Sequence, residues 1–301
     1  MSKTDPSCGL WGVRGGTLLN SQVRGVRAVG PGLLVAVAMA VCALGLLAGC
    51  HGTPVVQPVR LTVVAYNVEF GNRGTAEQVG EALIAYEPDV VAFNEVPGGD
   101  WVERAGVVLG MPYCYVGEIS SANHKDKYKA VLSRTPLHDT GELVLEGPGW
   151  NPASAVRAST RVGGREVVVY ALHVSGGAHG GQPRPGEQQS GDLARRAAEA
   201  TPGALVILAG DFNDRLGEAH MDDCLAAGFR ASWQDLGLDV SRASGLSTWN
   251  AAGGQRSGVI DHVLYRVPSA MRTVDGGIIA LDPVLADHHP VWAEFEIEPT
   301  P

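Results

Sequence analysis

Short apolar runs rich in β-branched residues recur along the chain from residue 59 onward, and they limit its possible folds more than any other feature. A run of this kind between turn residues is typical of a buried β-strand. The frequent Gly (40) and Pro (18) residues supply the turns. We therefore predict strands at Val59–Tyr66, Asp89–Phe93, Ala130–Ser133, Ala155–Val162, Glu166–Leu172, Leu205–Ala209, Val259–Tyr265 and Val291–Ile297.

Fewer segments have helical signals. Gly163-Gly164 is a two-residue turn that predicts a hairpin between its flanking strands. Because strands outnumber helices and no linker interrupts residues 59–298, we predict one α+β domain with two packed sheets and helices outside. The helices are expected at about Thr75–Tyr86, with Thr75 as the cap, at Trp101–Leu109 and at Glu187–Ala200.

An apolar run at residues 33–49 follows several basic residues and contains no acid, which is typical of an export signal. It leads into Leu47-Ala48-Gly49-Cys50, and small residues before a Cys resemble the lipobox of bacterial lipoproteins, in which the Cys is acylated. We expect residues 1–50 to be a signal or lipoprotein segment that leaves the domain outside the membrane, anchored through lipidated Cys50, with residues 51–58 as a tether. An uncleaved signal anchor is the alternative, although the run is short for a span of about 20 residues.

Export would place the two cysteines of the domain, Cys114 and Cys224, in an oxidising compartment. They could form one disulfide or remain two free thiols. Their spacing suits no metal site.

The charge of the domain limits its partners. Without its first 50 residues the chain has 19 basic and 31 acidic side chains, a formal net charge of −12. An acidic surface repels polyphosphate backbones, and nucleic-acid binders usually present a basic face. Tight binding of nucleic acid is therefore disfavoured, but nucleic acid as a substrate is not excluded, because a bound metal ion changes the local charge.

Polar side chains follow most of the predicted strands at the point where each strand ends. Each position alone is weak evidence for a functional site, because Asp and Asn side chains often form hydrogen bonds with their own backbone in turns. Together they supply oxygen ligands suited to Mg²⁺, with Mn²⁺ as the alternative, and His–Asp pairs suited to proton transfer. The oxygen ligands are Asn67, Glu95 and Asp287, and the other members are His173, Asp211, Asn213, Asp261 and His288.

The order of these motifs resembles the endonuclease/exonuclease/phosphatase superfamily, which includes deoxyribonuclease-I-like nucleases, neutral sphingomyelinases and inositol polyphosphate phosphatases. The resemblance spans Val59 to Ile297 and implies a four-layer α/β sandwich, in which two mixed β-sheets pack face to face with helices outside. The motifs are Asn67, Glu95 after Pro88-Asp-Val-Val, Ala130-Val-Leu-Ser-Arg134, His173, Gly210-Asp-Phe-Asn213, Ser247-Thr-Trp249, Ile260-Asp-His262 and Asp287-His288-x-Pro290.

The resemblance also implies roles. Glu95 would be the main metal ligand, completed by Asn67 and Asp287 directly or through water. Asp211 would orient or deprotonate the attacking water, and Asn213 would hold a phosphoryl oxygen. His288, oriented by Asp261, would contact the phosphate and transfer a proton, with His173 as a second acid or phosphate ligand.

Two departures from the family pattern concern substrate contacts. Tyr128-Lys129 replaces the usual Gly-Asn before the Ala130 strand, and Val259 stands where an Arg is common. Lys125, Lys127 and Lys129 form a basic cluster that is either a solvated loop or a lip that collects a substrate phosphate.

The sequence therefore predicts a metal-dependent phosphoesterase acting on a phosphodiester or phosphomonoester. Within that class, a nuclease acting on DNA and a sphingomyelinase-like phospholipid phosphodiesterase are both open. A non-catalytic surface binding protein on the same fold is the less favoured alternative, because none of the expected ligands is missing.

Overall fold

The computed structural model describes residues 58–147, 152–176, 185–200, 203–249, 258–266 and 271–298. All of them belong to one compact unit, Val56–Pro301. The apolar run 33–49, Cys50 and most of the expected tether lie outside the described residues. Within the described part, no helix combines the length and apolar character needed to cross a bilayer.

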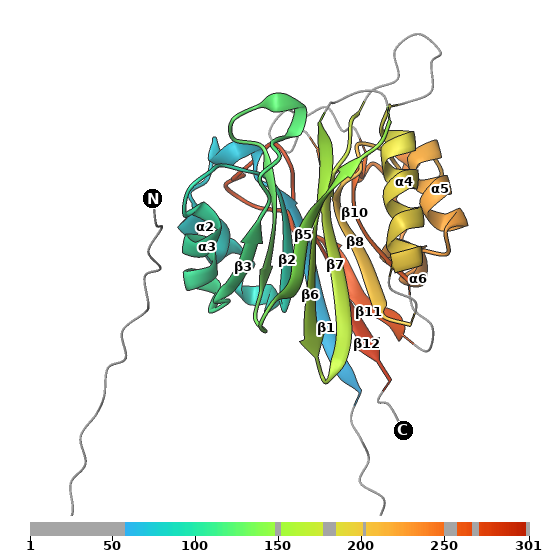
Figure 1. The fold of residues 1–301 in the computed structure, drawn as a ribbon, viewed down its shortest axis with the longest axis horizontal. Helices are drawn as coiled ribbons and strands as arrows, with labels where there is room; N and C mark the ends of the chain where they lie inside the picture. The colour runs from blue at the N-terminus through green and yellow to red at the C-terminus, as the bar shows by residue number, and fades with distance from the viewer. Residues whose placement is uncertain are drawn as a thin grey trace, which may run out of the picture. The chain divides into compact units, whose positions relative to one another are not determined.

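Two six-stranded sheets form the body of the domain (Figure 1). Sheet A has the order β11 (Met271–Ile278), β12 (Val291–Ile297), β1 (Val59–Asn67), β2 (Val90–Val96), β4 (Tyr128–Ser133), β3 (Tyr113–Val116). Sheet B has the order β5 (His138–Leu145), β6 (Ala153–Val162), β7 (Arg165–His173), β8 (Leu205–Asp211), β10 (Asp261–Arg266), β9 (Arg230–Ala231). Each sheet contains one parallel pair, β1–β2 in sheet A and β7–β8 in sheet B, among antiparallel neighbours.

Strand β1 shows how the sequence produces the layers. Its successive side chains point to opposite faces of the sheet, as in any strand. Leu61, Val63 and Ala65 pack into the core that sheet A shares with sheet B. Val64 and Tyr66 pack on the other face, in a second core that includes α2 and α3. Both faces are apolar in the second half of β1, so Val63 to Tyr66 form a continuous apolar run rather than an alternating one.

Helices cover the two outer faces (Figure 1). The helices α2 (Ala76–Leu83) and α3 (Trp101–Leu109) lie against sheet A, while α4 (Pro185–Ala200) and α5 (Ala219–Ala226) lie against sheet B. This arrangement confirms the predicted sandwich. The remaining short elements are α6 (Ser232–Asp235), η1 (Glu69–Gly71), η2 (Ile84–Tyr86), η3 (Ser121–Asn123) and η4 (Arg242–Ser244).

The eight predicted strands are the eight interior strands of the two sheets, with ends that differ by a few residues. The four strands that the prediction missed are β3, β5, β9 and β11, which are the four sheet edges. β5, for example, is largely exposed or half-buried and has no apolar run. An edge strand needs one neighbour for its hydrogen bonds and little apolar surface, so its sequence has a weak signal.

The two glycines of the predicted hairpin join β6 to β7, and both have positive φ, 57° at Gly163 and 79° at Gly164. Cys114 in β3 and Cys224 in α5 are free thiols, so the alternative of a disulfide between them is wrong. Cys224 is buried in the core while Cys114 is partly exposed.

Helix α2 begins with a capping box, in which Thr75 is the N-cap, as predicted from the sequence. The Gln78 backbone N–H donates to Thr75 Oγ1 at 3.3 Å, and the Thr75 N–H donates to Gln78 Oε1 at 2.9 Å. We expect Thr75→Ala to lower the free energy of unfolding by about 1 kcal/mol, because a helix N–H loses its partner. Urea denaturation checks this, and Thr75→Ser should keep most of the stability; equal loss in both variants would contradict the capping role.

Candidate active site

The expected site residues gather at one edge of the sandwich because of strand direction. The parallel strands β1 and β2 end side by side, with Asn67 paired to Asn94. The parallel strands β7 and β8 end with His173 paired to Asp211. β10 runs antiparallel to β8, so its first residue, Asp261, is paired with Asp211 at the same edge.

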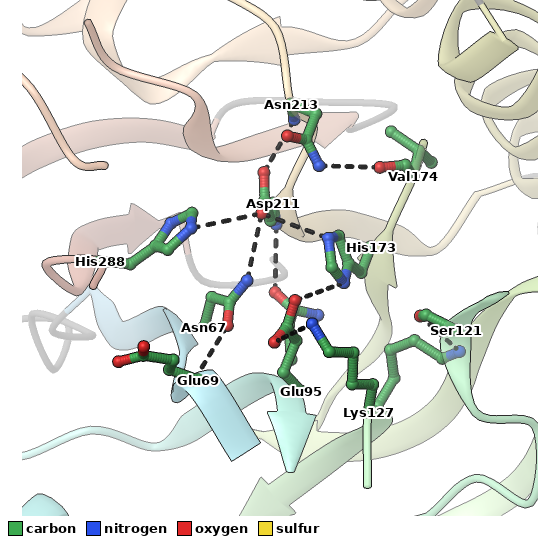
Figure 2. Close-up of polar contacts among 12 residues, drawn as sticks. Asn67, Glu69, Glu95, Ser121, Lys127, His173, Val174, Asp211, Asn213 and His288 are labelled. Carbon is green, nitrogen blue, oxygen red and sulfur yellow. Dashed lines mark hydrogen bonds and ion pairs between the residues drawn. The ribbon is translucent and has the colours of Figure 1, made fainter. Parts of the chain in front are cut away.

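The Asp211 carboxylate lies at the centre of this group and is buried. Its Oδ2 accepts a hydrogen bond from Asn67 Nδ2 at 3.1 Å, and its Oδ1 accepts one from the backbone N–H of Asn213 at 2.8 Å (Figure 2). His173 Nε2 and His288 Nε2 lie 3.4 and 3.7 Å from Oδ2. Burial and the nearby Asp261 carboxylate raise the pKa of Asp211 to about 7.

His288 and Asp261 form a buried pair, with 2.8 Å between His288 Nδ1 and Asp261 Oδ2. Burial alone would lower the pKa of His288, but the carboxylates of Asp261 and Asp211 outweigh it and raise this pKa to about 10. The imidazole is therefore a cation at neutral pH. Asp261 fixes the ring so that Nε2 points toward Asp211, which is the geometry of a His held by a carboxylate in acid–base catalysis.

His173 differs from His288 although both are buried. Burial, together with the positive charges of Lys129, His288 and Lys127, holds the pKa of His173 well below its usual value. Its Nδ1 lies 3.7 Å from Glu95 Oε1. A neutral imidazole can donate or accept a hydrogen bond, but it carries no spare proton at neutral pH. The site therefore contains one charged and one neutral His.

The Gly210-Asp-Phe-Asn213 turn has two unusual backbone positions. A Cβ on Gly210, whose φ is 146°, would lie 2.1 Å from the Leu172 carbonyl oxygen and 2.8 Å from Asn94 Oδ1, so only glycine fits between the strands there. Asn213 has a φ of 52°, in the left-handed region. Its amide donates to the Val174 carbonyl at 2.9 Å, which anchors the side chain with one of its two N–H groups (Figure 2).

Two of the three expected metal ligands lie together at the ends of β1 and β2. Asn67 contributes an amide oxygen, Glu95 a carboxylate, and both are buried. Glu95 sits in a bulge of β2 with a φ of 52°, a conformation that costs a non-glycine residue about 1–2 kcal/mol. Such strain is common where a side chain must be aimed at a site. These oxygen donors fit a hard divalent cation.

The third expected ligand, Asp287, lies in the loop before β12. It is half-buried, and its charge acts on Tyr66, Arg73 and His288. Among the described residues, no hydrogen bond or ion pair links its carboxylate to Asn67 or Glu95. Asp211, Asp261 and His288 also come within 4.8 Å of one another, but His288 is a cation bound to Asp261, which makes this triad a poorer metal site than Asn67 and Glu95.

The three lysines of the cluster lie in three different environments, so the cluster is not a uniformly solvated loop. Lys125 is exposed. Lys127 Nζ contacts Glu95 Oε2 at 2.9 Å. Lys129 is fully buried, and its Nζ donates to the Ile119 carbonyl at 2.7 Å. Burial lowers the pKa of Lys129 to about 8. The alternation of strand β4 turns Lys129 inward, which the local sequence of charges could not show.

Two residues to which the sequence analysis gave no role, Asn94 and Thr248, hold other residues of the site in place. Asn94 is fully buried, and its Oδ1 accepts the Asp211 backbone N–H at 3.0 Å. Thr248 Oγ1 accepts the backbone N–H groups of Ile260 and Asp261 at 3.0 and 3.2 Å. The neighbouring Trp249 pairs through its backbone with His288 and is 42% exposed. A polar residue directly before Glu95 was the one available signal for Asn94.

Comparison with known proteins agrees with this geometry. A family model described as the Endonuclease/Exonuclease/phosphatase family matches residues 64–288. No curated protein matches the chain. Similar solved structures include an endonuclease/exonuclease/phosphatase from Beutenbergia cavernae DSM 12333, with 20% identity over 79% of this chain and 72% of that chain and a TM-score of 0.62. TDP2 from D. rerio, complexed with a single strand DNA product, has 18% identity over 78% and 98% and a TM-score of 0.63. At such identities the likeness shows a shared fold.

We expect Asn94→Ala to lower the free energy of unfolding by about 1–3 kcal/mol, because it leaves the buried Asp211 N–H without a partner. Asn72→Ala is the matched control, since Asn72 is exposed and bonds only Glu69 at 3.2 Å. Urea denaturation of both variants checks this. Similar stability of the two would mean that the bond between the sheets contributes little.

The two buried imidazoles should titrate far apart. In metal-free protein, NMR of the ring nitrogens should show His288 protonated up to about pH 10 and His173 neutral at pH 6.5. The cause is that carboxylates face His288, whereas burial and positive charges dominate at His173. Spectra of His288→Gln and His173→Gln assign the signals. Titration of both rings near pH 6.5 would contradict the charge arrangement.

Proposed function

The chain belongs to the endonuclease/exonuclease/phosphatase family, and we propose that it is a Mg²⁺-dependent hydrolase that cleaves a phosphodiester or phosphomonoester bond with an activated water. Members of this family hydrolyse phosphate esters with a divalent metal ion. The observation that carries the proposal is the buried group of Asp211, Asp261 and His288 beside the oxygen donors Asn67 and Glu95.

Asp211 is the proposed base. Two hydrogen bonds, from Asn67 and Asn213, hold its carboxylate in one orientation. A pKa of about 7 lets this carboxylate both accept a proton from water and release it near neutral pH. An ordinary aspartate with a pKa near 4 would be a weaker base by roughly three units.

His288 is the proposed partner of the phosphate group. Its positive charge attracts a phosphoryl oxygen, and its Nε2 proton is available to a leaving oxygen while Asp261 holds the ring. Neutral His173 and the second amide N–H of Asn213 would donate hydrogen bonds to the same phosphate. Donors fixed by the fold stabilise developing charge better than mobile ones.

Glu95 and Asn67 would hold the metal ion, with Asp287 joining through water. The bound ion would neutralise charge on the phosphate and favour ionisation of water. Mn²⁺ would serve as an alternative, since both ions take oxygen ligands.

Within this class, the substrate is either DNA or a phospholipid head group. TDP2 from D. rerio has been solved with a single strand DNA product, which favours a nuclease here by analogy of fold. The acidic composition of this chain weakens that idea, since DNA backbones are repelled at long range. A phospholipid head group becomes the better candidate if the chain is a lipoprotein.

We also propose that the protein is exported and held at the membrane through acylated Cys50, on the strength of the Leu47-Ala48-Gly49-Cys50 sequence after an apolar run. Labelling cells with a fatty-acid analogue should mark the wild-type chain and not Cys50→Ser. Export of an unlabelled chain that stays in the membrane would instead support a signal anchor.

The purified protein should hydrolyse bis(p-nitrophenyl) phosphate with Mg²⁺ or Mn²⁺ and lose this activity with a chelator. Asp211→Ala and His288→Ala should each lose about 10²–10⁴-fold in kcat/KM, as expected for an acid–base group. His138→Ala is the matched control, because His138 pairs with Glu166 at the other end of sheet B. Equal activity of all variants would disprove the proposed site.

A panel of plasmid DNA, phosphomonoesters and phosphatidylcholine or sphingomyelin vesicles would identify the substrate. Activity restricted to one arm assigns the class. Folded protein that binds metal but cleaves nothing would support the alternative of a binding protein on this fold.

A further inference from the structure

Lys127 contacts the carboxylate that the proposed function assigns to the metal ion. Its Nζ lies 2.9 Å from Glu95 Oε2 (Figure 2). The same Nζ lies 5.2 Å from the centre of the Phe70 ring. The side chains of Lys127 and Glu95 are only 22% and 11% exposed, so solvent screens this pair less than a surface pair. No other Lys or Arg forms an ion pair with Glu95 among the described residues.

The backbone of Lys127 is held in place by the segment that precedes β4. The Lys127 N–H donates to Ser120 Oγ at 3.1 Å, and its carbonyl accepts the Ser121 N–H at 3.0 Å. These bonds close residues 120–127 into a fixed loop. Lys127 therefore reaches Glu95 from a defined position, unlike exposed Lys125 on the same loop.

A polar network anchors this loop to both sheets. Glu142 of β5 accepts the backbone N–H groups of Glu118 and Ile119 at 2.6 and 2.9 Å, and also the hydroxyl of Ser154 at 2.6 Å. Buried Lys129 lies 3.7 Å from Glu142 and donates to the Ile119 carbonyl. A Cβ on Gly117 would lie 2.7 Å from the Glu142 carboxylate, so the chain approaches it closely. These contacts hold the loop, and with it Lys127, in a fixed position.

We propose that the Lys127 ammonium is a built-in competitor for the Glu95 carboxylate, which a divalent cation must displace before it binds there. This inference rests on the proposed function, because it assumes that Glu95 is a metal ligand. The Lys127 ammonium and a metal ion would both bind the Glu95 carboxylate, and two positive charges bound to one carboxylate repel each other. Lys127 thereby weakens metal binding and sets the divalent-ion concentration at which the site fills.

The test measures Mn²⁺ binding to the purified full chain by the EPR signal of free Mn²⁺. Removal of a charge-assisted hydrogen bond of this kind should tighten binding by roughly ten-fold or more. We expect this for both Lys127→Gln and Lys127→Met, while Lys127→Arg keeps the charge and the wild-type Kd. Lys125→Gln is the matched control, since it removes the same charge from the same loop without contact to Glu95, and should also keep the wild-type Kd.

Circular dichroism and thermal melting establish that each variant is folded. Unchanged or weaker Mn²⁺ binding in both neutral Lys127 variants would overturn the inference, as would equal tightening in Lys125→Gln. Glu95→Gln distinguishes failure of the competitor role of Lys127 from failure of the metal site at Glu95. If Glu95→Gln abolishes Mn²⁺ binding but the Lys127 variants bind no tighter, the competitor role fails and the metal site stands. If wild-type protein binds no Mn²⁺, the proposed function and this inference both fail.

Discussion

Buried Asp211 ends a strand of one sheet and takes hydrogen bonds from the other, and much of the domain is arranged around that requirement. Asn67 donates to its side chain and Asn94 accepts its backbone N–H, and both residues come from sheet A, whereas Asp211 ends a strand of sheet B. A buried carboxylate without such partners would be costly. The packing of the two sheets, with their parallel strand pairs ending at one edge, supplies these partners.

The two buried imidazoles at this edge of the sandwich differ in charge. His288 is kept cationic by two carboxylates, whereas His173, a few ångströms from the same Asp211 oxygen, is kept neutral by burial and nearby cations. Lys127 supplies a cation to Glu95. The charges of His288 and Lys127 therefore each have a defined carboxylate partner within one small region.

The strands that could be predicted from the sequence are the buried ones. Interior strands such as β1 and β8 are covered on both faces, so their apolar runs are visible in the sequence. Edge strands such as β5 and β11 take their hydrogen bonds from a neighbour and carry polar or glycine residues, so nothing local marks them. Likewise Lys125, Lys127 and Lys129 are the same residue type but lie in three different environments. The alternation of β4 buries Lys129, and the loop before β4 directs Lys127 to Glu95 while Lys125 stays exposed.

The sequence by itself determined the interior strands, the capped helix at Thr75, the glycine hairpin and the set of polar residues at strand ends. These features depend on neighbours in the chain, through propensity and periodicity. The tertiary structure decided which of those polar residues meet, that Asn94 supports Asp211 across the sheets, and that Lys127 pairs with Glu95. Contacts between residues far apart in sequence depend on sheet order and register, which no local pattern encodes.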